Sequence, residues 1–122
     1  MGIQVSPHQS NPNLKLVQLS GRLDITSAET TSVAMVSALE QSGAGVIVDM
    51  AAMDFISSAG LRVLIMLRNK AQGGGKQVAF IHAHPAVYKI FKIAQLDTIL
   101  HFFEDDDEAI QALWPPTEKK GN

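Results

Sequence analysis

The stretch Asp54-Phe-Ile-Ser-Ser-Ala-Gly-Leu-Arg-Val-Leu64 decides how this 122-residue chain is organised. An apolar run, residues 46–50, leads towards it, and apolar side chains follow it at helical spacing: Leu61, Leu64 and Ile65. Two serines therefore stand where a strand passes into a helix, which we predict at about residues 58–71. The first backbone N–H groups of a helix lack partners inside it and carry the positive end of its dipole. An anion placed there, such as a phosphorylated serine, is favoured.

The composition is that of one globular domain, with 46% hydrophobic residues, 18% charged residues and no cysteine. The net charge is −2 and no basic stripe is present, so we expect no nucleic-acid partner. The lack of cysteine excludes disulfides and thiolate chemistry. No apolar run approaches the ~20 residues of a membrane span, and the first residues lack the pattern of a secretory signal. We therefore predict a cytoplasmic protein without a membrane span.

Strands alternate with helices along the first two thirds of the chain. A short strand at residues 3–5 and a turn cluster precede a second strand at 14–20, after which Gly21 allows a bend. A helix at about 27–41, capped by Thr26 or Ser27, carries a modest apolar stripe: Val33, Val36, Ala38 and Leu39. The nearly continuous apolar runs 45–50 and 76–82 are typical of central strands. With the helix between them they predict a right-handed parallel crossover.

The last third adds a helix opened by Pro85, a short strand near residues 99–102 and a short helix at 109–114 that follows the acidic run 104–108. The whole order predicts an α/β fold, with a mixed, mainly parallel sheet of four to five strands and about four flanking helices. We expect one domain over residues 1–114. Residues 115–122, which begin with two prolines, are expected to form a flexible C-terminal tail.

Ser57 and Ser58 admit a structural and a chemical explanation. Helix capping by serine stabilises a helix by ~1 kcal/mol over alanine, which is sufficient reason for a serine here. The surrounding Ser-Ser-Ala-Gly is small, however, and would be accessible to the active site of another protein. A serine hydrolase using Ser58 with His82 or His84 is a weaker interpretation, because the Gly-x-Ser-x-Gly elbow is missing.

The sequence provides no convincing cofactor or metal site. His82 and His84 alternate at a strand end, but no third ligand has a suitable spacing. The glycines at 73–75 end a helix, and the residues around them do not match a phosphate-binding loop. Asp24 follows the second strand, so in a parallel sheet it is expected at the same end as the serine turn. It is either a cap or loop acid, or, with Asp49 and Asp54, a carboxylate that would repel an attached phosphate.

Three segments in combination resemble the anti-sigma factor antagonists of the STAS group: Ser20-Gly-Arg-Leu-Asp24, Val46-Ile-Val-Asp-Met50 and Phe55-Ile-Ser-Ser-Ala-Gly-Leu61. The resemblance covers nearly all of residues 3–113. It implies a STAS-like regulatory protein that is not an enzyme. In that family the serine matching Ser58 is phosphorylated, and an acid matching Asp24 lies beside it. Ser57 and Ala59 depart from the frequent Asp-Ser-Ser-Gly form, which leaves Ser57 as an alternative acceptor.

The resemblance also implies partners. A serine-kinase-type anti-sigma factor would bind the unphosphorylated protein, phosphorylation would switch binding off, and a PP2C-type phosphatase would reset it, as in bacterial-type partner switching that regulates transcription. The residues expected to contact the kinase are Asp24, Ile25, Thr26, Ser27, Ser57, Ala59, Gly60, Leu61 and Arg62. A constitutive STAS adaptor in a larger signalling assembly, with the serine turn only capping the helix, is a further alternative.

Overall fold

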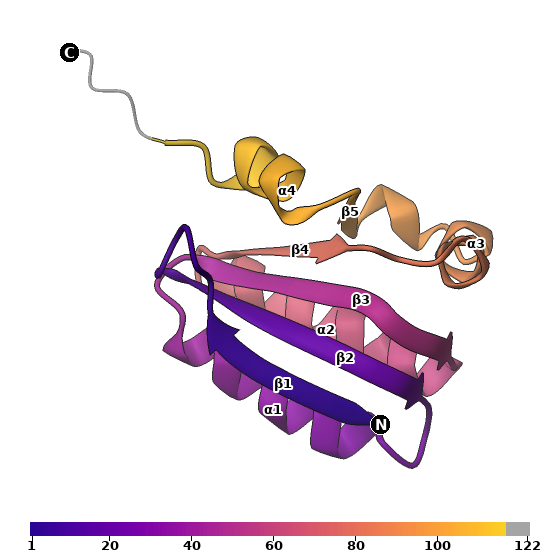
Figure 1. Cartoon of the computed structure of the whole chain (residues 1–122). Coiled ribbons are helices and arrows are strands. Elements are labelled where there is room, and N and C mark those ends of the chain that lie inside the picture. Colours follow the sequence, from indigo (N-terminus) through magenta and orange to yellow (C-terminus); the bar gives the residue numbers. More distant parts are fainter. Residues whose placement is uncertain (117–122) are drawn as a thin grey trace.

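Four helices flank a five-stranded sheet in the computed structural model, which describes residues 1–116 (Figure 1). The strands are β1 (Gly2–Pro7), β2 (Leu14–Leu23), β3 (Gly45–Ile56), β4 (Gln77–Ile81) and β5 (His101–Phe103). The helices are α1 (Ala28–Gln41), α2 (Ser58–Gly73), α3 (Pro85–Ile93) and α4 (Asp106–Leu113), with a short 3-10 turn at Leu96–Thr98. The strand order equals the chain order, and only the β1–β2 pair is antiparallel. This confirms the predicted fold class.

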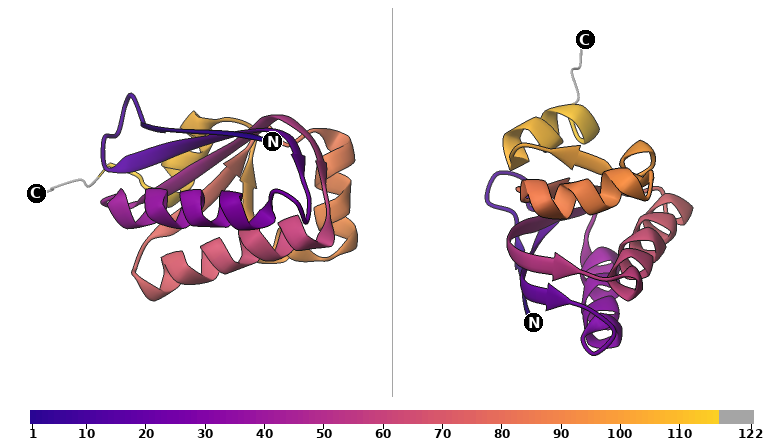
Figure 2. Two further views of the ribbon diagram at one scale, coloured as in Figure 1. Left: turned by 90° about the horizontal axis from the view of Figure 1, so that it is seen from below. Right: turned by 90° about the vertical axis from the view of Figure 1, so that its right-hand side faces the viewer.

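The two faces of the sheet are covered unequally. Helices α1 and α2 run side by side on one face, as the left view of Figure 2 shows, and α4 lies on the other face over β4 and β5 (Figures 1 and 2). The larger core lies under α1, α2 and α3, and its buried members include Met35, Leu64, Phe80 and Phe91. The smaller core lies under α4 and contains Leu14, Ile47, Ala79, Ile81 and Ala109. Because α4 is short, Gln18 and Ser20 of β2 remain exposed.

The apolar stripe predicted for α1 was wrong at Val33. Its side chain is 66% exposed, and the buried positions of α1 are Thr31, Met35, Ala38 and Leu39. This pattern also has helical spacing, but it begins at a threonine, which a count of apolar residues overlooks.

β2 and β3 are both longer than predicted. β3 does not end at Met50 but runs to Ile56, because Met53 and Ile56 continue its buried side while Asp54 is exposed. β2 does not bend away at Gly21. It continues to Leu23 with Gly21 at φ +85°, and the register against β3 shifts at this point. Glycine adopts such a positive φ at no steric cost. The two extensions carry the strand ends to the serine turn.

The last strand lies slightly later than predicted, and the last helix begins earlier than predicted. β5 occupies 101–103, and α4 begins at Asp106 because the Asp105 carboxylate accepts a hydrogen bond from the Glu108 N–H at 2.9 Å. Pro115 and Pro116 have no regular structure, and the rest of the expected tail lies outside the described residues. Within residues 1–116, none of the helices is long and apolar enough to cross a membrane.

Candidate functional site

The loops after β2 and β3 leave the sheet at the same end. Leu23 and Ile56 are paired in parallel register, and the Ser57 N–H donates to the Leu23 carbonyl oxygen at 2.9 Å. Adjacent parallel strands place their carboxyl ends side by side, which is where ligands of open α/β sheets bind. The structure therefore brings Asp24 to the same edge as the serine turn.

Ser57 and Ser58 have different structural roles. Ser57 is the N-cap of α2, with an extended backbone, and its Oγ accepts from the Gly60 N–H at 3.4 Å. Ser58 is the first residue of α2, its side chain is exposed, and its hydroxyl has no hydrogen bond to any of residues 1–116. Capping thus accounts for Ser57 but leaves Ser58 without a structural task.

Gly60 and Leu61 follow Ser58 in α2 and are less exposed than Ser58. A Cβ on Gly60 would come within 2.7 Å of Ile56 Cγ1 and 2.8 Å of both Leu23 Cγ and the Leu23 carbonyl oxygen. A glycine at this position therefore allows α2 to start close to the ends of β2 and β3. Leu61 packs against the larger core. Both residues were predicted to contact a partner, and their direct structural contribution is to position the exposed residues around them.

Hydrogen bonds hold the β2–α1 loop in shape. Asp24 Oδ1 accepts from the Thr26 backbone N–H at 3.0 Å and from the Thr26 hydroxyl at 2.7 Å. The hydroxyl hydrogen bond from Thr26 lowers the pKa of Asp24 below its usual value, so the carboxylate stays ionised at neutral pH. Ser27 occupies the N-cap position of α1 but its side chain does not cap the helix. Its Oγ instead accepts from the Asp24 N–H at 3.1 Å and donates to the Arg22 carbonyl at 3.0 Å.

Arg22 is a member of this edge that the sequence did not identify. Its guanidinium carbon lies 4.1 Å from the centre of the Phe55 ring, and its Nε is 3.7 Å from Asp24 Oδ2. Arg22 and Phe55 are partners across β2 and β3, although 33 positions separate them in the sequence. The sequence did not reveal this pair, because the register of β2 against β3 at Phe55 can be assigned only once β3 is known to reach Ile56.

The exposed part of this edge combines an apolar side chain with polar ones. Ile25 is 78% exposed at the tip of the β2–α1 loop, and Thr26, Ser58 and Arg62 are exposed as well. Arg62 lies four residues after Ser58 on α2, and side chains at this spacing are neighbours on a helix surface. Ala59 is partly buried. We use the term serine edge for the exposed surface formed by Asp24, Ile25, Thr26, Ser58 and Arg62.

His82 and His84 do not approach Ser58. His82 Nδ1 lies 3.0 Å from Asp49 Oδ1, and His84 Nε2 lies 2.6 Å from the Ala51 carbonyl oxygen. Ala51 lies in β3, six positions before Ser57, and six residues of extended chain span roughly 20 Å. A general base must lie within hydrogen-bond reach of its nucleophile, so the hydrolase interpretation lacks its geometry. Asp49 lies two positions before Ala51 in β3 and is therefore also distant from the serine edge. Within residues 1–116, no group of three or more potential ligands is placed to hold a metal ion.

Comparison with known proteins agrees with this architecture. The family model of the STAS domain matches residues 7–109. An anti-sigma factor antagonist from Mycobacterium paratuberculosis has a similar structure, with a TM-score of 0.80, 22% identity and 92% of each chain covered. A putative anti-sigma factor antagonist from Thermotoga maritima gives a TM-score of 0.81 at 14% identity, covering 91% of this chain and 93% of the other. This chain belongs to the STAS domain family.

A third similar structure is that of the Bacillus cell fate determinant SpoIIAA in its phosphorylated form. Its TM-score is 0.66 at 14% identity, with 91% of this chain and 99% of the SpoIIAA chain covered. At these identities the likeness establishes the fold, and the role of each residue at the serine edge stays a prediction.

Proposed function

We propose that this protein is a regulatory binding module of the anti-sigma factor antagonist type. In its unphosphorylated form, the serine edge binds a serine-kinase-type anti-sigma factor. The main support for this proposal is that two neighbouring serines have different structural roles. Ser57 caps α2, whereas Ser58 is exposed at the first position of the helix. A kinase can reach the Ser58 hydroxyl without first breaking a capping hydrogen bond.

Phosphorylation of Ser58 would change the charge of the serine edge without unfolding the domain. A phosphate adds about −1.5 to −2 charges at pH 7. The α2 dipole stabilises such a charge by ~0.3–1 kcal/mol, and Arg62 is near enough on the helix surface to contribute a further exposed ion pair of ~0.3–0.5 kcal/mol. These contributions make the modified protein stable by itself.

The same charge is unfavourable at an interface made for the unmodified protein. An unmatched charge facing a like charge in a complex costs several kcal/mol, which exceeds the stabilisation from the helix dipole. The ionised Asp24 carboxylate at the same edge adds to the negative charge. Phosphorylation therefore releases the partner, and removal of the phosphate by a PP2C-type phosphatase restores binding.

The test is to incubate the protein with its kinase-type partner and ATP and to map the phosphate by mass spectrometry. We expect phosphate on Ser58 in the natural protein and in Ser57→Ala, and none in Ser58→Ala. Phosphate found only on Ser57 or elsewhere would overturn the site. In pull-down experiments Ser58→Asp should weaken binding and Ser58→Ala should keep it constitutive. Binding unaffected by either substitution would instead favour a constitutive adaptor.

A further inference from the structure

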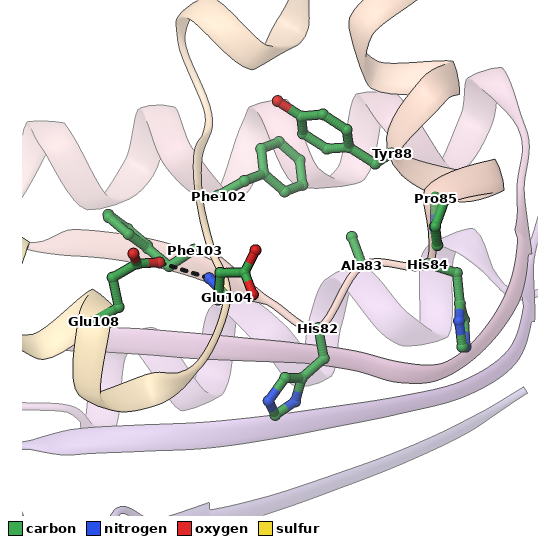
Figure 3. Close-up of a pocket in the computed structure, with 9 residues that line it drawn as sticks. All are labelled: His82, Ala83, His84, Pro85, Tyr88, Phe102, Phe103, Glu104 and Glu108. Atoms are coloured by element: carbon green, nitrogen blue, oxygen red, sulfur yellow. Dashed lines mark hydrogen bonds between the residues drawn. The ribbon is translucent and has the colours of Figure 1, made fainter.

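An open cleft of about 560 Å³ lies between α3 and α4, at the carboxyl ends of β4 and β5 (Figure 3). Its lining includes His82, Tyr88, Phe102, Phe103, Glu104 and Glu108. Small-molecule sites in proteins have volumes of about 300–1,000 Å³, and open α/β sheets bind ligands beyond the carboxyl ends of their strands. None of these residues belongs to the serine edge, so a ligand here would be independent of Ser58.

One wall of the cleft is a rigid aromatic surface. The ring centre of Phe102 lies 4.8 Å from that of Phe91 and 5.3 Å from that of Phe80, and both of these rings are fully buried. Tyr88 meets Phe102 edge to face, with centres 5.2 Å apart. Phe102 is only partly buried, so the buried rings hold it in place while part of its surface faces the cleft. Such a wall suits a flat or apolar ligand body.

The polar wall presents hydrogen-bond acceptors. Glu108 Oε1 accepts from the Glu104 backbone N–H at 2.7 Å, which fixes the Glu108 carboxylate beside the cleft. The Glu104 side chain points towards the strand end at Ala83 and His82 (Figure 3). Neither glutamate forms an ion pair with a cation of residues 1–116. Two carboxylates without a cationic partner among these residues create a negative potential in the cleft.

His82 lies at the strand end of the cleft and has a left-handed backbone. Its φ is +61°, a left-handed conformation that is rare for residues other than glycine and is often found at ligand sites. This conformation accompanies the contact between His82 Nδ1 and the Asp49 carboxylate at 3.0 Å.

We propose that the cleft binds a small organic cation, in which a flat apolar body carries an amidinium, guanidinium or ammonium group. The body would lie against Phe102 and Tyr88, and the N–H donors would face Glu104 and Glu108. The N-terminus of α3 also borders the cleft and favours anions, but Pro85 removes its first N–H. The N-terminus of α4 lies next to Glu104 and Glu108 as well, and each helix dipole is equivalent to about half a positive charge, so two carboxylates still outweigh the two dipoles. Ligands bearing phosphate groups are therefore disfavoured.

The experiment is a titration of the whole protein with benzamidinium, followed by the backbone amide signals of Ala83 and Phe103 in NMR spectra. Benzamide, which has nearly the same shape without charge, and benzoate, which has the opposite charge, are the matched probes. Glu104→Gln removes one carboxylate at an exposed position, where misfolding is not expected. Glu40→Gln makes the same change at an exposed position at the far end of α1 and serves as the control.

We expect saturable shifts at the cleft with a Kd below about 1 mM for benzamidinium. Binding should be about tenfold weaker for benzamide, absent for benzoate, about five- to tenfold weaker in Glu104→Gln and unchanged in Glu40→Gln. The absence of saturable shifts, equal binding of benzamide, or no effect of Glu104→Gln would overturn the proposal. Much tighter binding of a capped peptide containing one arginine would assign the cleft to a protein partner, which also contradicts it. Phosphorylation of Ser58 has no part in this test.

Discussion

The carboxyl ends of the β2–β3 pair and of the β4–β5 pair present opposite chemistry. At the first, β3 passes through two small serines directly into α2, so an exposed hydroxyl and a helix N-terminus lie at the same edge as Arg22 and Arg62. At the second, aromatic rings and the carboxylates of Glu104 and Glu108 surround an open cleft. One end suits an added anion and the other suits a bound cation. The residues that follow each strand, rather than the sheet itself, determine this difference.

The first of these ends is closely packed at Gly60, where the packing can be tested directly. Gly60→Ala would place a Cβ 2.8 Å from the Leu23 carbonyl oxygen and 2.7 Å from Ile56 Cγ1, so α2 must shift away from the strand ends. We expect a loss of about 2–3 kcal/mol in the free energy of unfolding, measured in urea.

Gly73→Ala is the matched control for this change. It makes the same substitution at the last residue of α2, where an added Cβ has no neighbour within 4 Å. It should be neutral or slightly stabilising, since alanine is the better helix former. Equal effects of the two substitutions would show that the close approach of α2 at Gly60 contributes nothing.

Substitution of Ser57 and substitution of Ser58 should change the free energy of unfolding by different amounts, because the two serines have different structural roles. Ser57→Ala removes the N-cap of α2, whose hydrogen bond is long at 3.4 Å, so we expect a loss of about 0.5–1 kcal/mol. Ser58→Ala should change the free energy of unfolding by less than about 0.5 kcal/mol, because the side chain is exposed. A larger loss for Ser58→Ala than for Ser57→Ala would reverse the assignment of capping and acceptor serines.

The helix α4 forms one side of the cleft. One contact that holds it against the rest of the domain contributes a stabilisation that depends on pH. The His8 side chain is buried, and its Nε2 contacts Asp106 Oδ2 at 2.7 Å. The hydrogen bond from His8 lowers the pKa of Asp106 below its usual value. The folded state therefore binds this proton less readily than the unfolded state, so the stabilisation is present above about pH 4 and is lost as the pH falls through the folded pKa.

Asp106→Asn should accordingly lower stability at pH 7 by a few tenths of a kcal/mol, since the Asp106 side chain is 42% exposed and the pair is screened by solvent. The difference from the natural protein should shrink at pH 3 in urea unfolding experiments. Asp107→Asn, on the exposed side of the same turn, is the control. A difference that grows towards pH 3 would contradict the assigned direction.

The sequence was sufficient for the serine edge in outline and insufficient for the cleft. Apolar runs at 45–50 and 76–82, with the helix between them, predicted a parallel crossover because such runs describe central strands. The position of Asp24 beside the serine turn followed from topology. The extension of β3 to Ile56 was missed, because the alanines at 51 and 52 and the aspartate at 54 are residue types that strands disfavour.

The cleft depends on contacts that no local pattern encodes. His82 meets Asp49 across two strands, and Phe102 meets Tyr88 between β5 and α3. The acidic run 104–108 was interpreted from its position before a helix, and Asp105 does cap α4. That Glu104 and Glu108 line the same cleft as Phe102 and Tyr88 is decided by how α3 and α4 pack against the sheet, which single-sequence periodicity does not report.

We propose that a phosphate on Ser58 releases a partner bound at the serine edge. The most direct test is to measure the affinity of the kinase-type partner for the unmodified protein and for the protein homogeneously phosphorylated at Ser58. A repulsion of several kcal/mol predicts a Kd raised by about 100-fold or more, with the fold preserved by circular dichroism. An equal Kd for the two forms, with both correctly folded, would contradict the account.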